Sequence, residues 1–179
     1  MAERNTVRLW LMRGIFAAIC GALIFWRLLP LDMLPARIAG PDLIVALSFA
    51  WVLRRPEYAP PLFIATILLM SDLLFQRPPG LWAALVLIAC ETLKQRASGL
   101  RDMGFLPEWL SVAGMALALW LAYRVVLAVF FVPQAPLSLT LMQLVATIAV
   151  YPIVVFVSTT LLGVRRVRPG DAESLGMRA

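Results

Sequence analysis

Six long apolar stretches, separated by short polar or proline-containing segments, occupy most of the chain. They cover residues 9–29, 38–53, 59–76, 80–95, 108–132 and 136–162. A hydrocarbon layer about 30 Å thick needs about 20 helical residues to cross it, and backbone groups in that layer must satisfy their own hydrogen bonds. The sequence therefore predicts an all-α membrane protein with a bundle of six transmembrane helices over residues 1–163. The tail over residues 164–179 is polar and basic, and is predicted to be cytoplasmic and disordered.

The second stretch is short for a membrane span, because Asp42 and Arg54 bound it closely. A re-entrant segment is the alternative, but it would leave Arg54 and Arg55 in hydrocarbon, where a charge costs about 2.5–3.5 kcal/mol or more. We therefore interpret it as a true span whose charged ends reach the membrane surface.

The basic residues predict the orientation. Of the sixteen Lys and Arg residues, only four fall on the outer side if the N-terminus is cytoplasmic, and the other twelve fall inside. The four are Arg27, Arg37, Arg77 and Arg124. Positive charge favours the cytoplasmic side, so both termini are predicted to be cytoplasmic. Topology and contact with anionic membrane lipids account for the net charge of +6, and no nucleic-acid partner is expected.

Composition argues against an enzyme. The chain is 62% hydrophobic, which leaves no room for a soluble domain, and it contains no histidine, which removes Ser-His-Asp catalysis and ordinary zinc sites. The acids are scattered, and the two cysteines, Cys20 and Cys90, lie inside apolar stretches as expected of packing residues. No catalytic residue, cofactor or metal site is predicted.

Two kinds of helical line stand out among the apolar residues. Small residues recur every four positions at Gly14, Ala18 and Ala22, and again at Gly114, Ala118 and Ala122. Such lines favour close contact with neighbouring helices. The last stretch carries polar residues along one side, namely Thr140, Gln143, Thr147, Tyr151 and Ser158. A polar line of this kind is expected to face other helices or a cavity.

Charged residues gather in the predicted outer half of the bundle. Asp72 and Arg124 lie within apolar stretches, and Asp42, Arg27 and Arg77 fall at a similar depth. A carboxylate at this depth needs a partner, so we expect Asp72 to pair with Arg124 or Arg77 inside a polar cluster. Two interpretations remain open: a binding site for a partner segment or small ligand, and a structural ion pair that fixes helix packing.

The order of several motifs resembles the family of rod shape-determining MreD proteins. Pro41-Asp42-Leu43-Ile44 opens a span with Trp51 near its end, and Asp72-Leu73-Leu74 is followed by Gly80. The segment 56–82 is similar to alphaproteobacterial members. Many members place a glycine soon after the aspartate, where this chain has Phe75-Gln76-Arg77.

The resemblance implies a non-enzymatic component of the bacterial inner membrane that takes part in cell elongation. Its expected partner is MreC, through a membrane helix and a periplasmic domain, within an assembly that includes MreB, RodA and a class B penicillin-binding protein. The fold would be similar to the S-components of energy-coupling-factor transporters. The alternative function is an S-component-like subunit for solute binding and transport. The candidate partner-site residues are Asp42, Asp72, Arg77, Gly80, Arg124, Arg27 and Gln143.

Overall fold

The computed structural model describes residues 2–29, 39–100 and 104–164, and all regular structure in them is helical. The helices are α1 (Ala2–Leu28), α2 (Leu43–Arg54), α3 (Pro61–Leu74), α4 (Leu81–Leu100), α5 (Phe105–Val129) and α6 (Leu137–Thr160), with a short 3-10 helix η1 (Pro56–Tyr58). The predicted all-α class and the six helices are confirmed. The predicted tail lies outside the described residues, apart from Val164.

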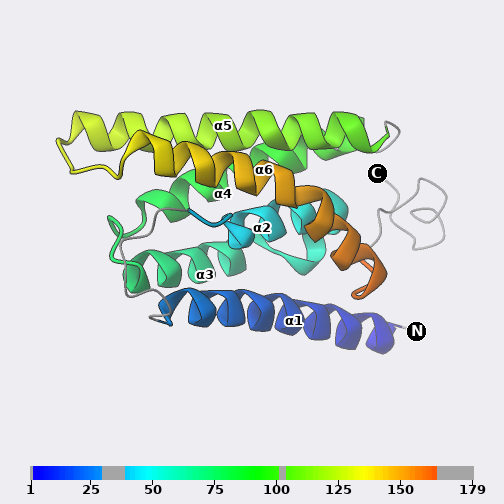
Figure 1. Cartoon of the computed structure of the whole chain (residues 1–179). Helices are drawn as coiled ribbons and strands as arrows, with labels where there is room; N and C mark the ends of the chain where they lie inside the picture. The colour runs from blue at the N-terminus through cyan, green and yellow to red at the C-terminus, as the bar shows by residue number, and fades with distance from the viewer. Residues whose placement is uncertain (1, 30–38, 101–103, 165–179) are drawn as a thin grey trace.

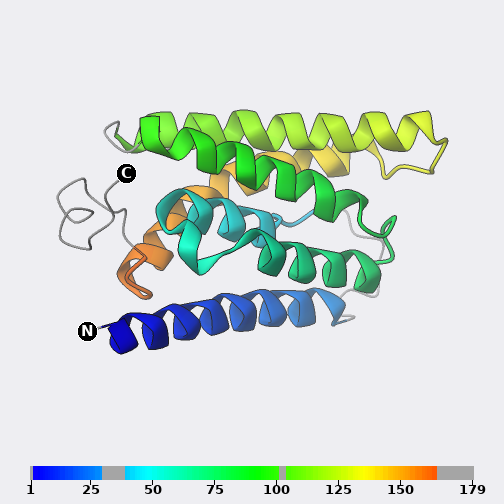
Figure 2. The same ribbon diagram turned by 180° about the vertical axis from the view of Figure 1, so that it is seen from behind.

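Helix α2 lies at the centre of the bundle, with α1 on one side and α5 and α6 on the other (Figures 1 and 2). Every residue of α2 after Leu43 is buried, and its closest neighbours are α4 and α6. The ring of Trp51 lies 5.1 Å from that of Phe16 in α1. A helix that is apolar on all sides and enclosed by other helices is a core helix, and this is the environment of α2.

Three helical segments are long and apolar enough to cross a membrane: Thr6–Leu28, Phe105–Val129 and Leu137–Thr160. Helices α2 and α3 are apolar but have only 12 and 14 residues. At about 1.5 Å per residue, α2 is roughly 18 Å long, shorter than a hydrocarbon layer of about 30 Å. Length and composition therefore show three helices that are able to cross a membrane, which suggests a membrane protein. The six-span arrangement is a proposal.

Consecutive helices run in alternating directions, which gives the bundle two distinct ends (Figures 1 and 2). The first turns of α1, the last turns of α6 and η1 lie at one end, here called the terminal end. The end of α1 and the turns at 75–80 and 130–136 lie at the opposite end, here called the distal end. Pro152 lies inside α6, and the last turns of α6 diverge from α5 toward α1 (Figure 1).

The lines of small residues do not pack inside the chain. Helix α1 buries Met12, Phe16, Cys20 and Ile24, whereas Gly14 lies on its exposed side. Gly114 is also exposed, and a Cβ atom at either glycine would meet nothing within 4 Å. The prediction that these lines contact neighbouring helices is wrong for the part of the chain that the structure describes. In α1 the buried side carries Met12, Phe16 and Ile24, whose large apolar side chains bury more surface than the small residues would.

Candidate functional site

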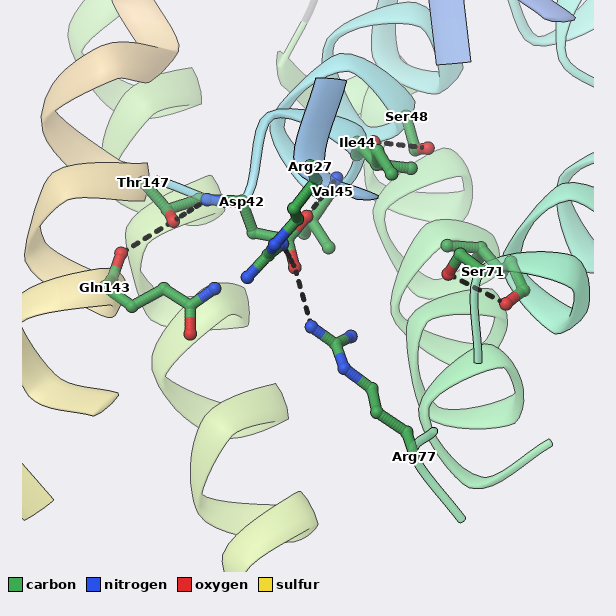
Figure 3. Close-up of polar contacts among 10 residues, drawn as sticks. Arg27, Asp42, Ile44, Val45, Ser48, Ser71, Arg77, Gln143 and Thr147 are labelled. Carbon is green, nitrogen blue, oxygen red and sulfur yellow. Dashed lines mark hydrogen bonds and ion pairs between the residues drawn. The ribbon is translucent and has the colours of Figure 1, made fainter. Parts of the chain in front are cut away.

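The candidate site at the distal end is centred on Asp42, which is 6% exposed. Its Oδ1 atom accepts a hydrogen bond from the backbone N–H of Val45 at 3.3 Å and so caps the start of α2. Its own backbone N–H donates to Oγ1 of Thr147 in α6 at 2.8 Å. Arg27 and Arg77 extend toward its Oδ2 atom, at 3.8 and 3.9 Å (Figure 3). These three charged residues are called the distal cluster below.

The two arginines of the distal cluster share an aromatic neighbour as well as a carboxylate. The guanidinium carbons of Arg27 and Arg77 lie 5.2 and 5.5 Å from the centre of the Phe75 ring. Their distances to Asp42 exceed the usual hydrogen-bond range of about 2.7–3.2 Å. Neither guanidinium donates a hydrogen bond to any residue that the structure describes. The distal cluster therefore holds two cations around one carboxylate.

Asp72 is fully buried and forms no ion pair with the residues that the structure describes. Its Oδ2 atom accepts a hydrogen bond from the backbone N–H of Ala83 at 3.0 Å. The hydrogen bond between Arg77 and Asp72 joins backbone atoms: the N–H of Arg77 donates to the carbonyl oxygen of Asp72 at 3.0 Å. The predicted side-chain pairing with Arg77 or Arg124 is wrong. The first N–H groups of a helix have no partner within it and attract negative charge, so the start of α4 takes the place of the expected cation.

Gly80 explains how the chain reaches that position. Its φ angle is +82°, in the left-handed region that glycine adopts without steric cost. This conformation turns the chain from the 75–80 segment into α4, beside the carboxylate of Asp72. Gly80 therefore has a conformational role in the candidate site.

Arg124 belongs to a different contact. Its Nη1 atom donates to Oγ1 of Thr140 at 3.1 Å and to the carbonyl oxygen of Ala135 at 3.4 Å. Its guanidinium carbon also lies 5.6 Å from the centre of the Trp120 ring. Arg124 thus joins α5 to the start of α6. The pairing of Arg124 with Asp72 was predicted from their similar depth in the apolar stretches. Arg124 instead uses acceptors at the start of the next helix in sequence.

The polar line of α6 faces the interior, where Thr147, Tyr151 and Ser158 are buried. Gln143 lies one turn before Thr147 and lines a small pocket of about 40 Å³ at the distal end. The pocket is also lined by Asp42 and Trp120. The indole N–H of Trp120 is buried and has no hydrogen-bond partner among the described residues. Gln143 is therefore beside the distal cluster, as Figure 3 shows.

Sequence reasoning missed a second charged cluster, near the terminal end. Arg54, at the last turn of α2, donates from Nη1 to Oε1 of Glu108 in α5 at 2.5 Å. The hydroxyl of Tyr151 in α6 donates to the same oxygen at 2.6 Å. All three residues are buried, and the side chain of Arg54 is only 6% exposed. The expectation that Arg54 reaches the membrane surface is wrong, because Glu108 offers it a buried partner. These residues are called the terminal cluster below.

A helix-start acid and a helix-end arginine at the same predicted depth could have indicated the terminal cluster. Glu108 lies in the first turn of α5, where a negative charge suits the helix dipole, and Arg54 ends α2. Tyr151 also lies on the polar line that was already noted in α6. The opposite charges of Glu108 and Arg54 were the available signal.

The buried carboxylates connect helices. Asp42 contacts α1, α6 and the turn before α4; Asp72 of α3 accepts from α4; and Glu108 of α5 accepts from α2 and α6. Within the described residues, no three His, Cys, Asp or Glu side chains gather in a way that could hold a metal ion. The arrangement fixes helices relative to one another. No family model, no curated protein and no solved structure matches this chain.

Proposed function

We propose that this protein is a non-catalytic component of the bacterial cell-elongation machinery, similar to MreD. It binds an MreC-like protein and links it to peptidoglycan synthesis by MreB, RodA and a class B penicillin-binding protein. The observation that carries the proposal is that each buried carboxylate joins helices. Asp42 and Asp72, which carry the resemblance, cap α2 and the start of α4. Acids used in this way favour a framework for protein contacts over a reaction centre.

In this proposal all six helices cross the inner membrane, with both termini in the cytoplasm and the distal end outside. The shortness of α2 is compatible with this arrangement because protein surrounds it. Its charged ends do not meet lipid: Asp42 lies against Arg27 and Arg77, and Arg54 lies against Glu108. A buried, paired charge avoids the cost of a lone charge in hydrocarbon.

Reporter fusions test the topology. Fusions at Pro78 and Pro133 are expected to report outside, and those at Glu57 and Gly99 inside. Fusions at Pro35 and Gly176, which the charge pattern predicts as outside and inside, lie outside the described residues. An inside signal at Pro78 would overturn the six-span arrangement.

The outward lines of small residues offer places for a partner helix. Gly14 in α1 and Gly114 in α5 both have open space beside them. Small residues let the backbones of two membrane helices approach closely, where large side chains would hold them apart. A protein with one membrane helix, as MreC-like proteins have, needs only one such line. We therefore expect one of the two lines to bind this helix.

Co-purification from native membranes tests the partner. Gly14→Leu and Gly114→Leu each add a large side chain to one line, and one of them is expected to abolish recovery of the MreC-like protein. Ala84→Leu, at an exposed position of α4, is the matched control and should recover it normally. Normal recovery with both glycine variants would show that neither line binds the partner. Failure of the unaltered protein to recover an MreC-like protein would overturn the proposed function.

A solute-binding subunit similar to an S-component is the second candidate. The pocket beside Gln143 favours it, as does the indole N–H of Trp120, which has no hydrogen-bond partner in the described part of the chain. However, the pocket volume is about 40 Å³, whereas ligand pockets usually measure about 300–1,000 Å³. Co-purification of an ATPase and a coupling subunit, in place of an MreC-like protein, would support this second candidate.

A further inference from the structure

An apolar groove of about 220 Å³ opens between α1 and α6, with α2 at its base. Ile19 and Leu23 of α1, Leu43 and Leu47 of α2, and Val154 and Val157 of α6 are among the residues that line it. The groove exists because α1 and α6 are both packed against other parts of the bundle and make few contacts with each other. An apolar groove open to the side of a membrane bundle is accessible to lipid chains.

The distal cluster adjoins one end of this groove. Leu23 lines the groove and Arg27 follows it by one helical turn, on the same side of α1. On α2, Leu43 lines the groove and Asp42 precedes it directly. Arg27 is the most accessible member of the cluster, with a side chain 40% exposed. A positively charged site and an apolar groove therefore lie next to each other.

The charges of the distal cluster favour a negatively charged ligand. Arg27 and Arg77 lie close enough to repel each other, and they share the single carboxylate of Asp42. Asp72 is close to Arg77, but its Oδ2 atom already accepts a hydrogen bond from the start of α4. Each guanidinium has five N–H donors, and none of them reaches a hydrogen-bond acceptor in the described chain. A phosphate oxygen would accept these hydrogen bonds and reduce the repulsion between the arginines.

We propose that this region binds a membrane phospholipid with an anionic phosphate head group. The phosphate contacts Arg27 and Arg77, and one acyl chain lies in the groove between α1 and α6. A free phosphate would leave the groove empty. An apolar partner helix would fill the groove but would leave the two arginines without an anionic ligand. A phospholipid satisfies both the charged and the apolar parts of the site.

The first test uses the unaltered protein. The protein is purified in a mild detergent, titrated with phosphatidylglycerol or phosphatidylcholine of the same chain length, and bound lipid is counted by native mass spectrometry. We expect one phosphatidylglycerol to bind about tenfold more tightly than phosphatidylcholine. Both lipids offer a phosphate, but the choline ammonium of phosphatidylcholine adds a positive charge beside the two arginines and cancels the net charge of the head group. Equal affinity for the two lipids would overturn the head-group site. Glycerol phosphate that binds as tightly as the lipid would overturn the groove.

Variants then separate the two parts of the site. Arg27→Gln and Arg77→Gln are each expected to remove the preference for phosphatidylglycerol, whereas Arg8→Gln, an exposed arginine of α1, should leave it unchanged. Val157→Trp fills the groove and should weaken both lipids several-fold. Val145→Trp, at an exposed position of the same helix, is its control.

The same titrations contain the results that would contradict the site. An equal loss of preference in Arg8→Gln would show that binding reflects overall charge. Unchanged binding in Val157→Trp would show that the chain lies elsewhere. The preference for phosphatidylglycerol is measured first on the unaltered protein. The proposal can therefore be refuted even if a variant does not fold.

Discussion

Glu108→Gln is the substitution that most directly tests the terminal cluster. Glutamine has nearly the same size as glutamate and keeps an oxygen that can accept the hydrogen bond of Tyr151. It removes the negative charge that lies 2.5 Å from Nη1 of Arg54. Because both side chains are almost fully buried, Arg54 would then carry a buried charge without a counter-charge. Breaking a buried pair in this way costs about 3–5 kcal/mol.

An exposed pair on α4 provides the matched control. Glu91 and Lys94 lie 3.3 Å apart, and both side chains are 40% exposed. Pairs of this kind contribute only about 0.2–0.5 kcal/mol on a helix surface. Glu91→Gln is the same chemical change as Glu108→Gln at an exposed ion pair, so it is expected to lower the free energy of unfolding by roughly a tenth as much.

The free energy of unfolding is measured in mixed micelles by titration with a denaturing detergent. The double variant Arg54→Met, Glu108→Gln leaves no charge in the cluster and is expected to be more stable than Glu108→Gln alone. A loss below about 1 kcal/mol for Glu108→Gln would contradict a buried ion pair. A double variant as unstable as the sum of the single variants would show that the two side chains do not interact.

Three further predictions use the same titration. Gly80→Ala should cost about 1–2 kcal/mol because the φ angle of +82° is unfavourable for a residue with a Cβ atom; no loss would show that this turn readily changes conformation. Gly114→Leu should leave the isolated protein as stable as before, because its position is open; a clear loss would place this line inside the bundle. Asp72→Asn and Arg124→Gln should be additive within about 0.5 kcal/mol, because the two side chains share no partner; a larger coupling would restore the predicted pair.

Hydropathy located the helices well because each loop contains a proline, a charge or both. It could not distinguish a helix enclosed by protein from one enclosed by lipid. Helix α2 shows the reason: its residues are apolar on every side, and both environments select that pattern. The small-residue lines show a related limit. Their spacing indicates that a helix can approach closely, but it does not indicate whether that helix belongs to the same chain.

The distal cluster was predictable in part. Asp42, Arg27 and Arg77 lie at the ends of consecutive helices on the same side of the bundle, so equal depth was sufficient to group them. The partner of Asp72 was not predictable from charge, because a search for opposite charges considers only side chains. The donor that Asp72 uses is the backbone N–H group of Ala83, and helix starts provide such groups whatever their side chains.

The terminal cluster shows why counting basic residues does not predict side-chain position. Arg54 contributes to the excess of positive charge at the terminal end whether its side chain reaches the membrane surface or turns inward. The count therefore stays the same in both cases. The difference in free energy between the outward and inward positions of the Arg54 side chain depends on Glu108 and Tyr151. These two residues are distant in sequence and come together only when α5 and α6 pack beside α2. A charge at a helix end therefore enters the topology prediction wherever its side chain points, whereas its surroundings follow from the packing of the other helices.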